Sequence, residues 1–200
     1  KKKPVIIDWG TTSFVYDGME KAVNPTVTNA VSGDTVNLTI EGTTTATNKG
    51  EYTATVTAID NENYTLINGE NLTKNWSVAE MINSFTTNLA ITGWVFGETP
   101  NAPTATAAFG TPEYTYSSSI DGAYSSDVPT EAGTYYVKAT VTGTENYAEL
   151  VSEAVEFVIG QKVLYADNIN TIADVVYTGE EIRPVIEVMD GNTVLVLDTD

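Results

Sequence analysis

The chain has 200 residues, of which 42% are hydrophobic, enough for packed cores and too many for wholesale disorder. Its 27 acidic residues against 9 basic ones give a formal net charge of −18, which excludes nucleic acid and anionic lipid as expected partners, because both are bound through Lys and Arg. The absence of cysteine and histidine excludes disulfides and thiolate metal sites, and removes the commonest general base near neutral pH.

No stretch of the sequence has the roughly 18 consecutive apolar residues that a membrane-spanning helix needs, so direct membrane insertion is not expected. The first residues, Lys1 to Pro4, do not form a signal peptide. We therefore expect an excised segment of a larger protein whose targeting signals lie elsewhere.

Three stretches of the chain open in the same way, with a short run of aromatic or β-branched residues, then a glycine, and a proline a few residues later. Landmarks that keep their order and spacing indicate an internal repeat. The three openings are Phe14–Gly18 with Pro25, Trp94–Gly97 with Pro103, and Val175–Gly179 with Pro184.

Two of these stretches also close in the same way. A Gly-x-Tyr step leads into an alternating strand at residues 49–58 and again at 132–141. The pairs Asn63-Tyr64 and Asn146-Tyr147 follow these strands, 83 residues apart, and a short aromatic strand ends each stretch. Three openings and two closings indicate two complete modules and part of a third. The predicted boundaries are 1–79 for the first module, 80–160 for the second, and 161–200 for the N-terminal part of the third.

Alternation of apolar and polar residues with a period of two predicts half-buried strands in both modules. Residues expected to point inward are Tyr52, Ala54, Val56 and Ala58 in the first module, and Trp94, Phe96, Tyr135 and Phe157 in the second. Turns are predicted at Ser32-Gly33-Asp34, Asn68-Gly69, Asp121-Gly122 and Asp190-Gly191-Asn192. The fold class is therefore all-β, as tandem immunoglobulin-like antiparallel β-sandwich modules of about 80 residues.

The Gly-x-Tyr step resembles the tyrosine corner of immunoglobulin-type sandwiches, in which a tyrosine hydroxyl bonds back to the backbone across a turn between two sheets. Tyr52 and Tyr135 match that position. The order of the motifs also resembles the MBG domains, bacterial immunoglobulin-like repeats found in tandem on large surface proteins. This second resemblance rests on Phe14–Gly18, on Lys49–Val56 with Asn63-Tyr64, and on Ala132–Val137 with Asn146-Tyr147.

The resemblance implies a cell-surface setting and a role in adhesion or display, without conserved catalytic residues. We interpret the chain as a non-catalytic stalk or spacer segment of an extracellular protein, on the cell surface or cell wall of a bacterium, with a Gram-positive source favoured. Its partners would then be other repeats of the same polypeptide. The alternative is a module that binds a glycan or a host protein through its loops or exposed aromatic residues.

Aromatic residues that could stack on sugar rings under this alternative were sought outside the predicted core. The best exposed ones are expected to be Trp9, Tyr114, Tyr116, Tyr124 and Tyr136. Catalysis has little support, because no serine has a histidine partner and no glycine-rich phosphate loop precedes a helix. We therefore expect no enzyme and no organic cofactor.

Two acid-rich turns supply the hard oxygen ligands that calcium prefers. They are Asp60-Asn61-Glu62 and Asp167-Asn168. Neither has the spacing of an EF-hand loop, and Asp and Asn are also favoured in turns for conformational reasons. Calcium is therefore a weak prediction at both turns.

Residues 161–200 contain the opening of a module but no Gly-x-Tyr strand. About 40 residues of β sequence do not easily bury a core of their own. Either this segment is trimmed, or another chain completes it by adding a strand, which would produce an oligomer through residues 161–200.

Overall fold

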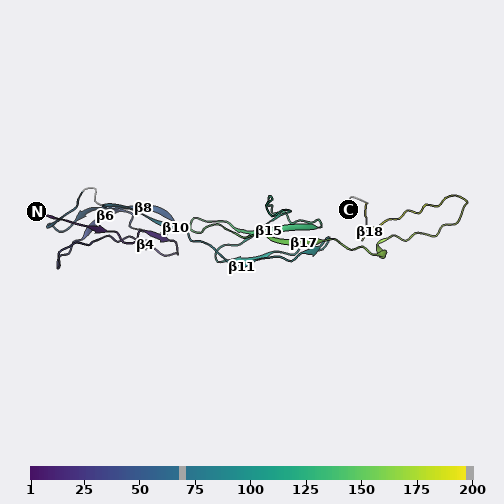
Figure 1. Cartoon of the computed structure of the whole chain (residues 1–200), viewed down its shortest axis with the longest axis horizontal. Coiled ribbons are helices and arrows are strands. Elements are labelled where there is room, and N and C mark those ends of the chain that lie inside the picture. The colour runs from purple at the N-terminus through teal and green to yellow at the C-terminus, as the bar shows by residue number, and fades with distance from the viewer. Residues whose placement is uncertain (68–70, 197–200) are drawn as a thin grey trace.

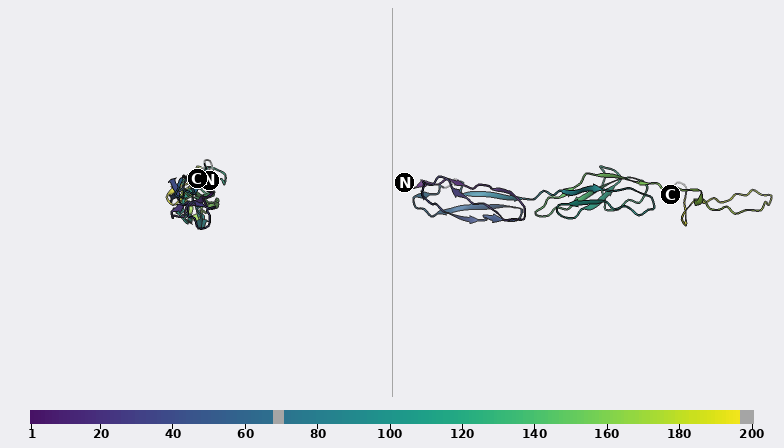
Figure 2. Two further views of the ribbon diagram at one scale, coloured as in Figure 1. Left: turned by 90° about the vertical axis from the view of Figure 1, so that its left-hand side faces the viewer. Right: turned by 90° about the horizontal axis from the view of Figure 1, so that it is seen from below.

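The computed structural model describes residues 1–67 and 71–196, and almost all regular structure within them is β-strand. Two flattened bundles of strands lie end to end, and a long extended hairpin follows the second (Figure 1). Viewed from one end, the parts project onto each other, so the molecule is a narrow rod (Figure 2). The predicted turn at Asn68-Gly69 lies outside the described residues.

The main sheet of the first module has four strands in the order β3-β10-β8-β6. β3 runs parallel to β10, whereas the other pairings are antiparallel. Their bounds are β3 Ser13–Val15, β6 Leu38–Gly42, β8 Gly50–Ile59 and β10 Thr73–Ala79. Short pairs complete the module: β1 (Lys3–Pro4) with β9 (Tyr64–Thr65), β2 (Ile7–Asp8) with β5 (Thr26–Val27), and β4 (Lys21–Ala22) with β7 (Thr45–Ala46).

The second module repeats this plan with β12-β17-β15-β14, and β16 also pairs with β15. The bounds are β11 Phe85–Ala90, β12 Trp94–Val95, β13 Thr104–Ala107, β14 Glu113–Ser117, β15 Gly133–Val141, β16 Leu150–Val151 and β17 Val155–Gly160; β11 pairs with β13. The register is the same in both modules, because Val78 pairs with Phe14 and Gly50, and Ile159 with Trp94 and Gly133. All-β repeats were predicted, and this prediction is confirmed.

Each module buries a separate apolar core, and among residues 1–67 and 71–196 no residue belongs to both. The first core contains Val5, Ile7, Trp9, Val23, Ala54, Val56, Tyr64, Trp76 and Val78; the second contains Leu89, Trp94, Tyr116, Val137, Ala139, Phe157 and Ile159. Because the buried residues of the first core come from the main sheet and from the short pairs, the two sets of strands face each other. Each module therefore has its own source of hydrophobic stabilisation.

In both modules a tryptophan and a phenylalanine from the same two strands pack together, but which strand carries the tryptophan differs between the modules. In the first, Phe14 on β3 meets Trp76 on β10 edge to face, with ring centroids 6.0 Å apart. In the second, Trp94 on β12 stacks on Phe157 of β17 at 5.2 Å. One indole and one phenyl ring fill the same layer in both cases, so total core volume is kept while the positions are swapped.

Alternation along β8 breaks near its end. Ala54 and Val56 are buried as predicted, but Ala58 is exposed and Ile59 is half-buried instead. The pairing with β6 changes register between Thr39 and Ile40, which is a β-bulge. A bulge inserts one extra residue and therefore moves the following side chains to the opposite face. The prediction that Ala58 points inward was wrong for this reason.

The prediction that Phe96 belongs to the core was also wrong. Trp94 and Phe157 are buried and Tyr135 is half-buried against the second core, but Phe96 is 37% exposed. Phe96 lies just beyond β12, where its N–H donates to the carbonyl of Gly160. The side chain therefore stands at the end of the module and outside its core.

Residues 161–196 form the extended hairpin. Its regular structure consists of a short 3₁₀ helix, η1 (Ala166–Asn168), and one small pairing of β18 (Met189–Asp190) with β19 (Thr193–Val194). Many apolar side chains of this segment are exposed, among them Val175, Val176, Tyr177, Val185 and Ile186. No helix among the described residues is long and apolar enough to cross a bilayer.

Candidate functional site at the joint between modules

The first acid-rich turn is held by hydrogen bonds within the module. The backbone N–H and the side-chain amide of Asn37 donate to the two carboxylate oxygens of Asp60, at 2.8 and 2.6 Å. These bonds hold the pKa of the Asp60 carboxyl below its ordinary value. Asn61 accepts from the N–H of Asn63 and donates to the carbonyl of Thr35. The oxygens of Asp60 thus already join two loops.

The second acid-rich turn has a similar structural use. Asn168 accepts from the N–H of Tyr165 at 2.7 Å, and its amide donates to the carbonyl of Met189 at 2.9 Å. Within residues 1–67 and 71–196, no group of three or more Asp or Glu side chains is arranged to hold a metal ion. Calcium binding by Asp60, Asn61, Glu62, Asp167 or Asn168 stays a prediction.

Two of the five aromatic residues predicted to be exposed are buried. Trp9 is 3% exposed, and its indole N–H donates to the carbonyl of Asn71. Tyr116 is 8% exposed and packs against Phe157 in the second core. Small sandwiches need large side chains to fill their cores, and this requirement explains why both Trp9 and Tyr116 are buried.

The other three aromatic residues, Tyr114, Tyr124 and Tyr136, are half-buried. The Tyr136 hydroxyl donates to Glu156 at 3.0 Å, and the Lys138 ammonium lies 4.4 Å from the centre of the Tyr124 ring. These contacts occupy the edge of one phenol and a face of the other.

The tyrosines of the two Gly-x-Tyr steps lie in matching places. Each ring folds back over its glycine, so closely that a methyl group on Gly50 would lie 2.8 Å from the Tyr52 hydroxyl, and one on Gly133 3.3 Å from the Tyr135 ring. The rings also pack against the aromatic residue of the last strand, with centroids 4.8 Å apart for Tyr52 and Trp76 and 5.9 Å for Tyr135 and Phe157.

Their hydroxyl groups differ. Tyr52 donates to the carbonyl of Asn48 at 2.7 Å, whereas the hydroxyl of Tyr135 makes no hydrogen bond to residues 1–67 or 71–196. We expect Tyr52→Phe to destabilise the first module by about 1 kcal/mol, because one hydrogen bond is lost. Tyr135→Phe should change the second module far less. Unfolding each variant in denaturant, with hydrogen exchange in β8 and β15 as the readout, would measure the stability of each module. Equal losses of stability from the two substitutions would contradict the prediction.

The Asn146-Tyr147 pair lies between the two modules. Tyr147 stacks on Phe109 of its own module, with ring centroids 4.2 Å apart. Its other contact crosses the joint, where Tyr16 meets it edge to face at 5.4 Å and an interplanar angle of 83°. Burial, together with the neighbouring Tyr16 phenol, raises the pKa of Tyr147. Tyr147 is therefore an aromatic link between the modules.

Asn146 adds hydrogen bonds across the same joint. Its side-chain oxygen accepts from the backbone N–H of Lys49 at 2.8 Å, and its amide nitrogen donates to the side-chain oxygen of Asn48 at 3.1 Å. The Asn146 side chain thus uses both its acceptor and its donor on one turn of the first module. A primary amide is suited to this role because it carries both functions.

The connecting segment is fixed as well. The N–H of Met81 donates to the carbonyl of Asn146, and the N–H of Ala148 donates to the carbonyl of Met81. Asn83 is buried, donates to the carbonyl of Phe109 at 2.8 Å and accepts from the N–H of Phe109 and of Ser84. At Met81 and Asn83 the linker is therefore hydrogen-bonded to the module that follows it.

Sequence reasoning found the Asn-Tyr repeat but did not place it at the joint. The reason is distance along the chain, because Asn146 meets Asn48 and Lys49 nearly 100 residues away. The first copy gave no guide, since Tyr64 is buried in its own core, where its hydroxyl donates to Asp34 and accepts from the N–H of Val31. The sequence feature that could have indicated the joint is the polar pair Asn48-Lys49, which comes just before the Gly-x-Tyr step and supplies the hydrogen-bonding partners of Asn146.

A family model described as "MBG domain" matches the chain over residues 7–75 and again over residues 96–162, together more than half of its length. No curated protein and no solved structure matched the chain. Each matched segment covers most of one sandwich, although the second begins after β11 and β12. The residues that meet at the joint, such as Tyr16 and Tyr147, lie inside the two segments.

Proposed function

Because this chain belongs to the MBG domain family, over two consecutive segments, we propose that it is a non-catalytic, semi-rigid spacer in a bacterial cell-surface or adhesin protein. MBG domains are repeat domains of surface proteins. In this role the modules hold another part of the protein away from the cell. The spacer works mechanically and uses no cofactor.

The observation that carries this proposal is the joint. Two sandwiches connected only by a flexible linker would tumble independently and would not keep a fixed length. Here the Tyr16–Tyr147 contact and the two side-chain hydrogen bonds of Asn146 join the modules directly. An aromatic pair of this kind contributes about 0.5–1.5 kcal/mol. Such a joint favours one orientation without making bending impossible.

The charge fits the proposed setting, which is extracellular, on the surface or wall of a Gram-positive type of cell. A net charge of −18 on 200 residues makes neighbouring copies repel each other. At physiological ionic strength this repulsion acts over about 8 Å, close enough to oppose side-by-side association. Acidic rods can therefore stand densely without aggregating.

The proposal is tested by removing the link. We expect Tyr147→Ala to broaden the distribution of distances between the two modules, because the ring contact across the joint is lost, while each module stays folded. Spin labels on cysteines placed at Thr57 and Ser118, which are exposed, would report this distribution by double electron–electron resonance. The chain has no native cysteine that would take up label.

A matched control lies in the same joint. Ile82 is 84% exposed and is a linker residue, so Ile82→Ala removes apolar surface there without removing a packed contact. This variant should keep the narrow distribution. A distribution that is already broad in the unmodified chain, or one that is unchanged by Tyr147→Ala, would contradict the semi-rigid spacer.

A further inference from the structure

The far end of the second module presents the same surface that receives Asn146-Tyr147 at the first joint. The N–H of Phe96 donates to the carbonyl of Gly160 at 2.8 Å, as the N–H of Tyr16 donates to the carbonyl of Ala79 at 2.9 Å. Phe96 therefore stands where Tyr16 stands. Gly133 occupies the same register position as Gly50. Counting back from these glycines, Glu131 corresponds to Asn48 and Ala132 to Lys49.

The hairpin that follows supplies the other wall, again in matching order. Lys162 comes two residues after the end of β17, as Met81 does after β10. Asp190 precedes a glycine with φ +59°, as Phe109 precedes one with φ +77°. In the first joint Met81 and Phe109 contact Asn146-Tyr147 directly. The two joints are thus built from corresponding positions.

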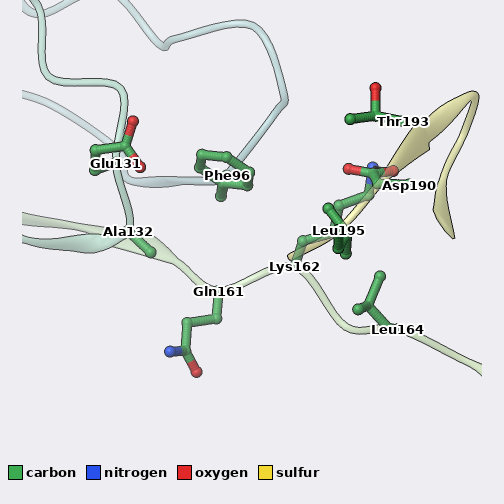
Figure 3. Close-up of a pocket in the computed structure, with 9 residues that line it drawn as sticks. All are labelled: Phe96, Glu131, Ala132, Gln161, Lys162, Leu164, Asp190, Thr193 and Leu195. Atoms are coloured by element: carbon green, nitrogen blue, oxygen red, sulfur yellow. Dashed lines mark hydrogen bonds and ion pairs between the residues drawn. The ribbon is translucent and has the colours of Figure 1, made fainter. Parts of the chain in front are cut away.

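Between these walls lies an open hollow of about 610 Å³ (Figure 3). It is lined by Phe96, Glu131, Ala132, Lys162, Asp190 and Leu195, among others. The picture shows Phe96 and Glu131 on the side of the second module, and Asp190 and Leu195 on the side of the hairpin. At the first joint the corresponding space is filled by the Asn-Tyr turn.

We propose that this hollow is a docking seat for an Asn-Tyr turn, carried by the strands that complete residues 161–196 as a third module. The polarity of the seat matches such a turn. The Ala132 N–H can donate to the asparagine oxygen, as Lys49 does at the first joint, and the Glu131 carboxylate can accept from its amide nitrogen, as Asn48 does. The exposed Phe96 ring replaces Tyr16 as the partner of the tyrosine.

The exposed apolar side chains of the hairpin support the same occupant. Val175 and Ile186 are each more than half exposed, although the residues that correspond to them, Phe14 and Val27 in the first module and Trp94 and Ala105 in the second, lie in or against the cores. Strands that cover these side chains would bring the turn after the Gly-x-Tyr strand to the hollow, as β15 brings Asn146-Tyr147 to the first joint. The wall on the side of the hairpin differs from that of the first joint in chemistry, because a Lys162–Asp190 ion pair stands in place of Met81 and Phe109.

The test tethers the turn to the intact chain. A copy of residues 143–150, whose turn is closed by the Thr144 N–H donating to the carbonyl of Tyr147, is joined by a short Gly-Ser linker after Asp200. Such a linker gives an effective concentration in the mM range. We expect hydrogen exchange at the Ala132 amide to slow by about fivefold, together with NMR shift changes at Phe96.

Two controls decide the outcome. The same tether with the Asn-Tyr pair replaced by Ala-Ala should leave Ala132 and Phe96 unchanged. Phe96→Ala should abolish the effect of the Asn-Tyr tether, whereas Val95→Ala, at an equally exposed neighbour outside the hollow, should not. Identical spectra for the two tethers, or an effect that survives Phe96→Ala, would overturn the seat. The seat extends the proposed spacer to a second joint and relies on it, but its failure would leave the distance measurements on the first joint unaffected.

Discussion

Replacing Trp76 by alanine is expected to destabilise the first module by about 3–5 kcal/mol and to leave the second at its original stability. Trp76 is 1% exposed and touches both Phe14 and Tyr52. Its indole N–H also donates to the carbonyl of Thr43 at 2.7 Å. The substitution therefore opens a cavity in the centre of a small core and removes a buried hydrogen bond. A domain of this size has only about 5–15 kcal/mol of stability, so much of the module's total is lost.

Hydrogen exchange followed by mass spectrometry would resolve the two modules, because β8 and β15 report on separate cores. Exchange in β8 should accelerate strongly, and exchange in β15 should not change. Val15→Ala is the matched control, since Val15 neighbours Phe14 on β3 but is 55% exposed, and it should have little effect on either strand. Equal acceleration in β8 and β15 would mean that the rod unfolds as one unit, and would contradict independent modules.

The strands of the main sheets could be predicted from the sequence because they depend on local alternation. Trp76 and Val78 on β10 are buried, as are Phe157 and Ile159 on β17, where the pattern has a period of two and a tyrosine strand beside it. The prediction failed at Ala58, where a bulge in the pairing with β6 reverses the faces. The extra residue is on β8 itself, between Val56 and Ala58. A bulge is defined by the pairing with a neighbouring strand, so the alternation within β8 alone does not reveal it.

Burial of single aromatic residues could not be predicted in the same way. Trp9 and Tyr116 were expected on the surface and lie in the cores, whereas Phe96 was expected in a core and lies at a module end. Trp9 and Phe96 each come just after a two-residue strand, where alternation no longer says which way a side chain points. Tyr116 lies within β14, but it and the next residue, Ser117, are both buried, so alternation breaks at this end of the strand. The joint is harder still, because its geometry depends on how two modules meet and not on the pattern within either one.

The second large effect is expected from Gly93→Ala, which should destabilise the second module by about 3 kcal/mol, at the upper end of the usual cost of overpacking. A methyl group on Gly93 would lie 2.1 Å from the carbonyl oxygen of Val158 and within 3.2 Å of two further backbone atoms of that residue. Backbone atoms of β17 cannot rotate away, so β12 would have to move. Its Trp94 would then lose the stacked contact with Phe157.

Gly97→Ala separates this steric effect from the conformational one. Gly97 has φ +83°, a left-handed backbone that costs an alanine about 1–2 kcal/mol, but no atom lies within 4 Å of the added methyl group. We therefore expect Gly93→Ala to lower the denaturation midpoint of the second module more than Gly97→Ala does, with no change in the first module. At the position that corresponds to Gly93, the first module carries Ser13, which pairs with Ser77 and accommodates its side chain. The need for glycine at position 93 thus comes from how closely β12 approaches β17. If Gly97→Ala proved less stable than Gly93→Ala, backbone conformation rather than this close approach would determine the cost of substitution in the second module.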